Sequence, residues 1–436
     1  MADSKTLEEL EEQETGVTRE YRWKVMWASI VGYAMDGLDV LILSFAMAAI
    51  VKEFGLTLGQ GGLIATYTLI GTVLGGYLFG ILADYFGRVH TFALSIVIFS
   101  IFTGACAFAD TAWHLELLRF LAGLGLGGEY GIGMTLVAET WPAAKRARAT
   151  AGVAMGWQAG AVLAAVLAAV VLPHFGWRGL FLVGVLPAIF AAWSRHGLKE
   201  PPMWVKRQEQ KKELARRVKA GETLSEEERK TYEETHRFSL FHLFESPSKT
   251  ITTVALTVMT SVQNFGYYGI MVWLPMILLK EHGLTTGSMA GWMVVTVIGM
   301  IAGIYLFGHL CDKMGRKIPY IMFYIGSAAM VYIYANLDTP TELLFGGAVL
   351  GFFCNGMMAG YGALLSENYT TDARSTAQNF IFNTGRAVGG FAPWIIGMLA
   401  QNYGFDGAFL LLCGIYLAAA LNVVLFIKDT KGVTIV

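Results

Sequence analysis

The chain has 436 residues, of which 55% are hydrophobic and only 15% are charged, and its formal net charge is −1. Soluble globular proteins carry about 25% charged residues, so this composition excludes an ordinary soluble protein and indicates a protein embedded in a lipid bilayer. The near-zero net charge excludes a general electrostatic attraction to nucleic acid.

Long apolar runs follow one another along almost the whole chain. A helix needs about 20 apolar residues to cross the hydrocarbon core of a bilayer, and the sequence offers twelve such runs. We expect membrane-spanning helices at residues 23–50, 60–82, 90–109, 112–140, 149–172, 177–195, 250–279, 287–311, 318–336, 341–368, 374–401 and 405–427. The expected fold class is therefore an all-α polytopic membrane protein with twelve transmembrane helices.

A strongly charged segment divides these runs into two sets of six. Inside this segment, Ser225 and Glu228 have the spacing of a capping box, which predicts a short helix outside the membrane. The expected organisation is an N-terminal segment (1–22), a first six-helix bundle (23–195), a linker (196–249), a second six-helix bundle (250–427) and a tail (428–436).

Lys and Arg gather in alternate connections between the predicted helices, as at Arg88, Lys145 and Lys313. By the positive-inside rule, these connections and both termini are cytoplasmic. Residues 1–22 are acidic and polar, and they lack the basic start and short apolar core of a secretory signal. We expect a monomeric, multi-pass protein of a prokaryotic-type inner membrane.

The residue types that bind metals or perform catalysis are sparse and scattered. The four cysteines lie singly in or beside apolar runs, without the paired spacing of a metal site or a disulfide framework. His90, His114, His174, His282 and His309 lie near the ends of predicted helices, with no nucleophile or metal-ligand spacing. We expect no cofactor, no metal site and no enzymatic activity.

The two halves of the chain are related by a constant offset of 228 residues. The string Tyr77-Leu78-Phe79-Gly80 corresponds to Tyr305-Leu306-Phe307-Gly308, and Gly176 corresponds to Gly404. One offset maintained over several helices indicates a parallel internal repeat. Such repeats are typical of transporters that rock two bundles around a site at the midplane.

The connection after the second predicted helix carries a motif that the repeat duplicates. Gly80-x-x-x-Asp84-x-x-Gly87-Arg88 returns as Gly308-x-x-x-Asp312-x-x-Gly315-Arg316, and it resembles the cytoplasmic loop signature of the major facilitator superfamily. Arg119-x-x-x-Gly123, Glu139 and Arg146 are similar to further signatures of that family. The resemblance covers about residues 23–430 and implies two six-helix bundles with alternating access.

The same motif residues are candidates for a gate at one face of the membrane. Gly80 lacks a side chain, so two helices can approach closely there. Asp84 and Arg88 lie at a helix end, where they can pair across the seam between the bundles; a fixed structural salt bridge is the alternative. The expected gating residues are Gly80, Asp84, Gly87, Arg88, Glu139, Arg146, Gly308, Asp312, Gly315, Arg316, Glu367 and Arg374.

Charged side chains also occur inside the predicted spans. Their cost at the bilayer centre is several kcal/mol each, and a charge kept there indicates function by default. Asp36, Asp39 and Glu129 are candidate proton carriers, because a buried carboxyl group holds a proton when no cation is near and releases it when one approaches. The alternative is that one Asp caps a helix break at Gly37 and the other pairs with an Arg.

Two arginines in the predicted spans are candidate ligands for an anion. Arg119 and Arg386 each carry a guanidinium fork, which binds a carboxylate through two hydrogen bonds. Asn379, Asn383 and Arg386 form one polar stripe at spacing i, i+4 and i+7, although Arg386 has the alternative role of neutralising an acid. The remaining expected substrate-binding residues are polar side chains of cavity-facing helices: Gln158, Asn264, Tyr267, Tyr268 and Asn355.

Shorter motifs point to a subgroup. Asp36-Gly37-x-Asp39 resembles the helix-one motif of aromatic acid:proton symporters, and Gly127-Gly128-Glu129-Tyr130 resembles the sialate:proton and metabolite:proton symporters. The resemblance implies that Asp36, Asp39 and Arg119 are needed for uptake of an organic acid. We expect proton-coupled symport of an organic anion, which is an aromatic acid, a sialic or sugar acid, or a small organic acid. In this mechanism the substrate occupies an Arg and frees a carboxylate to take a proton.

Other transport activities remain open. Glu200-Pro-Pro and Asp429-Thr-Lys-Gly432 resemble loop motifs of sugar carriers, and Gln263-Asn264 can bind hydroxyl groups, so a sugar or polyol porter is the first alternative. A drug:proton antiporter is a weaker one, because residues 156–160 lack the Gly-Pro pair of that group. Sodium is the alternative coupling ion, held by Asp36, Asp39 and carbonyl groups at Gly37.

Overall fold

The computed structural model describes residue 12 and residues 16–56, 58–220, 222–236, 239–271 and 286–433. Throughout these residues the regular structure is helical, which confirms the all-α expectation. The first half contains α2 (Arg19–Phe54), α3 (Leu58–Phe86), α4 (Arg88–Ala105), the short η1 (Cys106–Phe108), α5 (Ala112–Thr140), α6 (Arg146–Val183) and α7 (Leu186–Gly197). The second half contains α10 (Pro247–Met271), α12 (Thr286–Met314), α13 (Lys317–Ala335), α14 (Pro340–Gly356), α15 (Met358–Asn368), α16 (Arg374–Gly389) and α17 (Ala392–Phe426).

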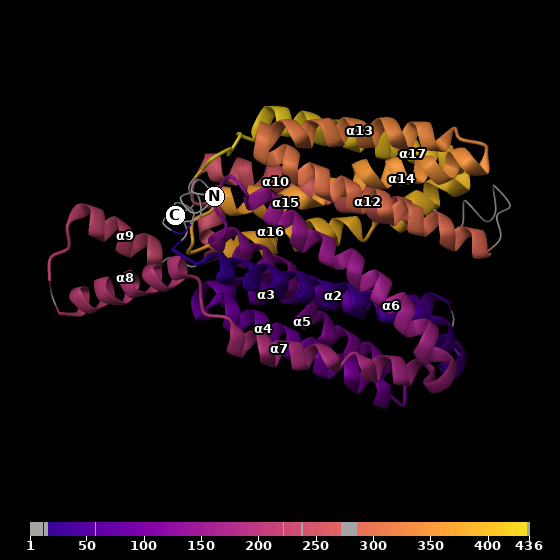
Figure 1. Ribbon diagram of the computed structural model, residues 1–436, viewed down its shortest axis with the longest axis horizontal. Helices are drawn as coiled ribbons and strands as arrows, with labels where there is room; N and C mark the ends of the chain where they lie inside the picture. The colour runs from indigo at the N-terminus through magenta and orange to yellow at the C-terminus, as the bar shows by residue number, and fades with distance from the viewer. Residues whose placement is uncertain are drawn as a thin grey trace, which may run out of the picture.

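The linker forms α8 (Pro202–Lys219), α9 (Glu226–His236) and η2 (Ser239–Phe244). The capping box that begins α9 is confirmed, because the Glu228 backbone NH donates to Ser225 Oγ at 3.2 Å and the Ser225 NH donates to Glu228 Oε2 at 2.9 Å. Figure 1 shows α8 and α9 projecting from one end of the molecule, which we call the linker end.

Glycine and proline interrupt the backbone of several long helices. Gly176 and Gly404, which are 228 residues apart, have φ of 62° and 71° and kink α6 and α17 at the two places where one expected helix ends and the next begins. The run expected at 374–401 breaks after α16, and α17 begins with a proline in its first turn, which removes a backbone donor. The run expected at 341–368 breaks at Met357 between α14 and α15, and residues 272–279 of the seventh expected helix lie outside the described part.

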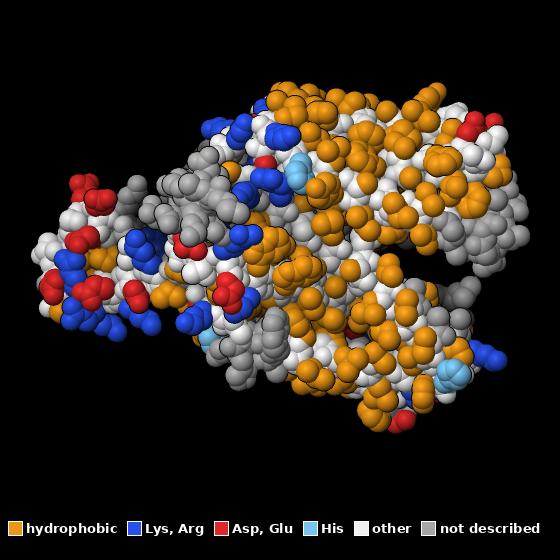
Figure 2. Space-filling model, in the orientation of Figure 1, with side chains coloured by type: hydrophobic (Ala, Val, Ile, Leu, Met, Phe, Trp, Pro, Cys, Tyr) orange, Lys and Arg blue, Asp and Glu red, His pale blue; other side chains and the backbone are white. Residues whose placement is uncertain are grey.

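The two halves form two bundles that lie side by side (Figure 1). Ten candidate membrane spans are found by length and hydropathy among the described residues. Hydrophobic side chains spread over both bundles on the face that Figure 2 shows. Large apolar residues are exposed in each bundle, as at Leu78 (49%) and Leu421 (57%). This apolar surface is what a lipid environment requires of a multi-pass protein.

The bundles meet near the linker end and are separated by a gap at the opposite end, which we call the open end (Figure 2). Close contact near the linker end depends on equivalent glycines of the repeat. A Cβ atom at Gly80 would lie 2.8 Å from Asn379 Cβ, and a Cβ atom at Gly308 would lie 2.8 Å from Ala151 Cβ. Any larger residue at either position therefore forces the bundles apart.

Candidate functional site

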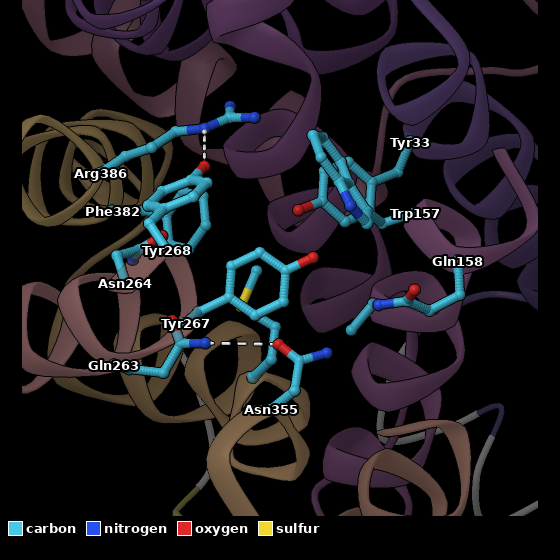
Figure 3. A pocket seen from close by; sticks show the side chains of 12 residues that line it. Tyr33, Trp157, Gln158, Gln263, Asn264, Tyr267, Tyr268, Asn355, Phe382 and Arg386 are labelled. Atoms are coloured by element: carbon cyan, nitrogen blue, oxygen red, sulfur yellow. Dashed lines mark hydrogen bonds between the residues drawn. The ribbon is translucent and has the colours of Figure 1, made fainter. Parts of the chain in front are cut away.

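A small central cavity lies between the two bundles (Figure 3). Both halves of the repeat contribute to its wall, from α2 and α6 on one side and α10, α14, α15 and α16 on the other. The lining residues are Tyr33, Ala154, Trp157, Gln158, Gln263, Asn264, Tyr267, Tyr268, Asn355, Met358, Phe382 and Arg386.

Arg386 on α16 supplies the positive charge of this wall. Its Nε donates to the Tyr268 hydroxyl at 3.4 Å, and its guanidinium carbon lies 5.2 Å from the centre of the Trp157 ring. These contacts fix the plane of the guanidinium group. Arg386 as a whole is only 5% exposed. Its Nη1 faces Asp36, which is not one of the residues that line the cavity.

Asp36 on α2 is the acidic neighbour of Arg386. Its Oδ2 lies 3.9 Å from Arg386 Nη1, beyond hydrogen-bond distance. Both carboxylate oxygens are buried, and neither has a hydrogen-bond partner among the described residues. A buried carboxylate without hydrogen bonds is costly, so Asp36 is held in a state that favours either a closer cation or a proton.

Aromatic rings form much of the remaining wall. Tyr33 and Trp157 of the first bundle lie with ring centres 5.5 Å apart. Across the cavity, Tyr267 and Tyr268 of α10 meet edge to face at 5.4 Å, and Figure 3 shows the Tyr267 hydroxyl directed into the space between the bundles. The cavity is thus flanked by aromatic rings on both sides.

Amide side chains gather at the end of the cavity away from Arg386 (Figure 3). Gln263 Nε2 donates to Asn355 Oδ1 at 3.4 Å, while Gln263 Oε1 is buried without a hydrogen-bond partner in the described part of the chain. Among the described residues, Gln158 Nε2 makes one long contact, 3.9 Å to the Met300 sulfur. Asn264 Nδ2 instead donates to the Thr260 carbonyl at 2.8 Å. Donors and acceptors of Gln158, Gln263 and Asn355 are therefore available to a ligand.

Arg119 and Asp39 form a separate ion pair inside the first bundle. Arg119 Nη2 lies 2.9 Å from Asp39 Oδ2, and its Nε donates to Thr68 Oγ1 at 3.2 Å. The Thr103 hydroxyl donates to the same carboxylate. Both charged side chains are almost fully buried, and neither lines the cavity, so the structure places Arg119 away from Arg386.

Three further predicted residues also lie outside the cavity wall. Glu129 accepts a hydrogen bond from Ser95 in the first bundle, and its other oxygen is buried without a partner among the described atoms. Asn379 packs against Gly80, and Asn383 Nδ2 donates to the Gly127 carbonyl at 3.3 Å. Both asparagines therefore belong to the seam between the bundles.

At the linker end, the two motif aspartates cap helices of the opposite bundle. Asp84 on α3 accepts hydrogen bonds from the backbone NH groups of Ser375 and Thr376 at 3.2 and 2.8 Å, at the start of α16. Asp312 on α12 accepts from the NH groups of Ala147 and Arg148, both at 3.2 Å, at the start of α6. A carboxylate at a helix N-terminus satisfies free NH groups and interacts favourably with the helix dipole.

Two glutamates add ion pairs across the same seam. Glu139 Oε1 lies 3.1 Å from Arg88 Nη2 in its own bundle and 2.7 Å from Arg374 Nη1 in the other. Its repeat equivalent Glu367 pairs with Arg316 at 2.7 Å and with Arg146 of the other bundle at 3.0 Å. We call the motif aspartates, these glutamates and their four arginines the charged seam.

Two caps of the charged seam were not expected from the sequence. Glu200 Oε2 accepts from the backbone NH of Arg88 at 2.7 Å, and Asp429 Oδ1 accepts from that of Arg316 at 3.0 Å. Each carboxylate lies against a motif glycine with positive φ, 106° at Gly87 and 90° at Gly315. A side chain at either glycine would be strained and would collide with the cap. The sequence signal that could have identified these two caps was the resemblance of the segments that begin at Glu200 and Asp429 to loop motifs of sugar carriers.

The sequence interpretation also missed the aromatic lining residues Tyr33, Trp157 and Phe382. Aromatic residues inside apolar helices look like core packing. Their position in the sequence near predicted site residues could have identified two of them, since Tyr33 lies three residues before Asp36 and Trp157 directly precedes Gln158.

Comparison with known proteins gives one family for the whole chain. The family model described as Major Facilitator Superfamily matches residues 29–300 and 256–434. A Haemophilus influenzae protein named only as a transporter of an unspecified metabolite is 46% identical, covering 96% of this chain and 99% of its own. The cis,cis-muconate transport protein of Acinetobacter baylyi is 31% identical, with coverage of 94% and 96%. A solved structure of the proton:xylose symporter XylE matches with a TM-score of 0.77 at 18% identity, over 95% of this chain and 97% of that one.

Proposed function

The chain belongs to the major facilitator superfamily and is a metabolite transporter, not an enzyme; on this premise we propose that it is a proton-coupled symporter of an organic anion. A relative named for the transport of cis,cis-muconate supports an organic acid as substrate. The observation that carries the proposal is the loose pairing of Arg386 with Asp36 at 3.9 Å beside the cavity.

The coupling follows from competition for one guanidinium group. A substrate carboxylate that enters from the open end forms charge-assisted hydrogen bonds with Arg386, which are stronger than neutral ones. Asp36 has no hydrogen bond from the described residues to retain its charge, so it takes up a proton when Arg386 binds the substrate. Substrate and proton then cross together, because binding of either one favours binding of the other.

In an alternating-access mechanism, the charged seam is the gate that closes the linker end. Contacts between the bundles at the linker end hold that end shut, while the open end admits substrate (Figure 2). With both termini and the linker on the cytoplasmic side, as the positive-inside rule favours, this arrangement is an outward-open state of an uptake system in the inner membrane. Rocking of the bundles then breaks the seam and releases substrate inward.

The ion pair of Asp39 with Arg119 has a different part in this proposal. Arg119 and Asp39 are hydrogen-bonded to each other and to two threonine hydroxyls. Arg119 is therefore not available to bind an anion. Glu129, hydrogen-bonded by Ser95, remains a candidate to receive the proton after Asp36. The substrate-binding role thus falls on Arg386, with Tyr268 fixing its orientation.

A neutral sugar or polyol is the second candidate substrate. The amides of Gln158, Gln263 and Asn355 favour it, since they bind hydroxyl groups as well as polar substituents of an acid. A neutral substrate, however, leaves the pairing of Arg386 and Asp36 without a role in coupling.

Uptake into proteoliposomes tests the proposal. Labelled carboxylates and labelled sugars are compared while pH and Na⁺ gradients are imposed separately, with control vesicles that lack the protein. The proposal expects accumulation of a carboxylate driven by an inward proton gradient. Transport of neutral sugars without any acid, or accumulation driven by Na⁺ alone, contradicts it.

A further inference from the structure

We propose that Ser95 positions the Glu129 carboxyl group in both of its protonation states, and that the proton of Asp36 leaves through Glu129 inside the first bundle. This inference rests on the proposed function, because it needs Asp36 to take up a proton. It goes further by assigning the route on which that proton leaves, apart from the central cavity.

Ser95 on α4 can form a hydrogen bond with Glu129 whether or not Glu129 is charged. The Ser95 hydroxyl lies within hydrogen-bond distance of two oxygens, the Phe92 carbonyl at 2.8 Å and Glu129 Oε1. A hydroxyl has one hydrogen and two lone pairs. Ser95 donates to a charged Glu129; when Glu129 carries a proton, it donates to Ser95 Oγ, and Ser95 donates to the Phe92 carbonyl. Glu129 therefore gains or loses a proton without losing this bond.

No cation is available to Glu129 among the described residues around it. Its side chain is fully buried, and Oε2 has no hydrogen-bond partner in the described part of the chain. Arg119 of the same helix pairs with Asp39, and Arg386 faces Asp36. A buried carboxylate without a cation is costly, so we expect Glu129 to hold a proton until one can leave.

Gly32 on α2 brings Glu129 close to the helix that carries Asp36. A Cβ atom at Gly32 would lie 3.1 Å from Glu129 Oε2 and 2.3 Å from the Phe92 ring, so the missing side chain leaves space for the carboxyl group. Asp36 is four residues further on the same face of α2, about 6 Å along the axis. Glu129 Oε2 thus lies against the helix face from which Asp36 projects.

This face of α2 continues toward the linker end with Ser29. Ser29 precedes Gly32 by three residues and lies beside Gly133 of α5, where a Cβ atom would be 3.4 Å from Ser29 Cβ. The Ser29 hydroxyl is buried, and the described residues offer it no hydrogen-bond partner. Asp36, Glu129 and Ser29 therefore form a row of buried oxygens that leads toward the linker end.

The proton moves along this row in two steps when the linker end opens. First the O–H bond of Glu129 breaks, and its proton passes Ser29 to water at the linker end. Then the O–H bond of Asp36 breaks, and that proton binds Glu129. Asp36, now charged, pairs again with Arg386, from which the substrate has departed. One proton crosses in each cycle, by a route that the substrate does not use.

Infrared spectroscopy on the purified full chain tests the proton on Glu129 without any substrate. A protonated carboxyl group has its own C=O stretching band, and the spectrum at pH 7 is expected to lose such a band in Glu129→Gln. Ser95→Ala is expected to shift this band to higher frequency, because the acceptor of its hydrogen bond is lost. Ser100→Ala removes the other buried serine hydroxyl of α4, and as the matched control it is expected to leave the band unchanged. Identical spectra of the wild type and Glu129→Gln would overturn the assignment.

Transport separates proton transfer from a structural role. Glu129→Gln is expected to slow proton-driven accumulation of the carboxylate that the proteoliposome assay identifies by at least about tenfold. Exchange of labelled for unlabelled carboxylate needs no net release of a proton, so it is expected to stay near the wild-type rate. Ser95→Ala is expected to slow accumulation by about three- to tenfold, and Ser95→Thr, which keeps the hydroxyl, is expected to restore most of it.

The outcomes distinguish the inference from the function beneath it. If Glu129→Gln accumulates the carboxylate as fast as the wild type, or loses exchange together with accumulation, the route through Glu129 is wrong, while a symporter with Asp36 as its proton carrier stands. If the wild-type protein shows no proton-driven accumulation, both the inference and the proposed function are overturned.

Discussion

Arg386 and Asp36 face each other across the boundary between the two bundles, 3.9 Å apart and without a hydrogen bond. Asp39, three residues further along α2, forms a tight pair with Arg119 of α5 at 2.9 Å. One chain therefore holds a loose ion pair beside its cavity and a closed ion pair inside its first bundle. The loose pair can exchange partners with a ligand, and the closed pair cannot do so without breaking hydrogen bonds.

Replacement of Arg386 is expected to weaken binding of a carboxylate. Hydrogen bonds to a charged group contribute about 1.5–3 kcal/mol, so Arg386→Gln is expected to lower affinity by roughly 10- to 100-fold. Arg386→Lys keeps the charge but loses the planar fork, and an intermediate loss is expected. Calorimetric titration with the carboxylate that the proteoliposome assay identifies measures both effects, and equal affinity in all three proteins would remove Arg386 from the binding site.

The pair of Asp39 and Arg119 is expected to matter first for stability. Removing one member of a buried ion pair destabilises a protein by about 3–5 kcal/mol, because the other charge stays buried and unpaired. Asp39→Asn and Arg119→Gln are each expected to lower the melting temperature in detergent. The double variant, which leaves no unpaired charge, is expected to recover part of the loss. A double variant that melts at the sum of the two shifts contradicts this account.

The two motif aspartates are expected to act as equivalent halves of one gate. Loss of a helix cap costs about 0.5–2 kcal/mol, so Asp84→Asn and Asp312→Asn each shift the population toward a state that is open at the linker end. Spin labels at Phe86 and Met314, which are exposed and correspond in the repeat, report the separation of the bundles after native cysteines are replaced by alanine. Both variants are expected to add a longer distance, and an effect from only one of them contradicts equivalence.

The linker offers a prediction about pH. Hydrogen bonds from Arg217 and then from Ser225 lower the pKa of Glu228 from its usual 4.5 to about 2. Because the folded pKa is lowered, the stabilisation of the start of α9 is present above pH 4.5 and is lost as the pH falls toward 2. Hydrogen exchange at pH 5, 4 and 3 is expected to show protection of the first turn of α9 that falls progressively, with the larger loss between pH 4 and pH 3. In Arg217→Met the decline is expected nearer pH 4.5, and identical profiles would contradict the assignment.

The sequence predicted most of the architecture because its signals are local or repeated. Span length and hydropathy identify membrane helices, and the 228-residue offset relates Asp84 to Asp312 and Gly176 to Gly404 without any coordinates. The kinked glycines and the caps observed at these positions follow the same offset.

The cavity was harder to predict, because it depends on depth and register between helices. Asn379 and Arg386 share one stripe of α16, but seven residues of helix separate them by about 10 Å along the axis. Asn379 therefore lies in the seam while Arg386 reaches the cavity. Likewise, nothing in the sequence tells which of the two helix-one aspartates meets Arg119, because that depends on how α2 and α5 are aligned.

Proton uptake on substrate binding tests the central claim most directly. The purified protein in weakly buffered detergent is mixed with the carboxylate that the proteoliposome assay identifies. A pH-indicating dye follows the protons removed from solution, and calorimetry confirms that the acid binds. The account predicts proton uptake by the wild-type protein, and binding without proton uptake by Asp36→Asn. Equal proton uptake by both proteins would contradict the account, because Asp36 would not be the group that takes the proton when Arg386 binds the substrate.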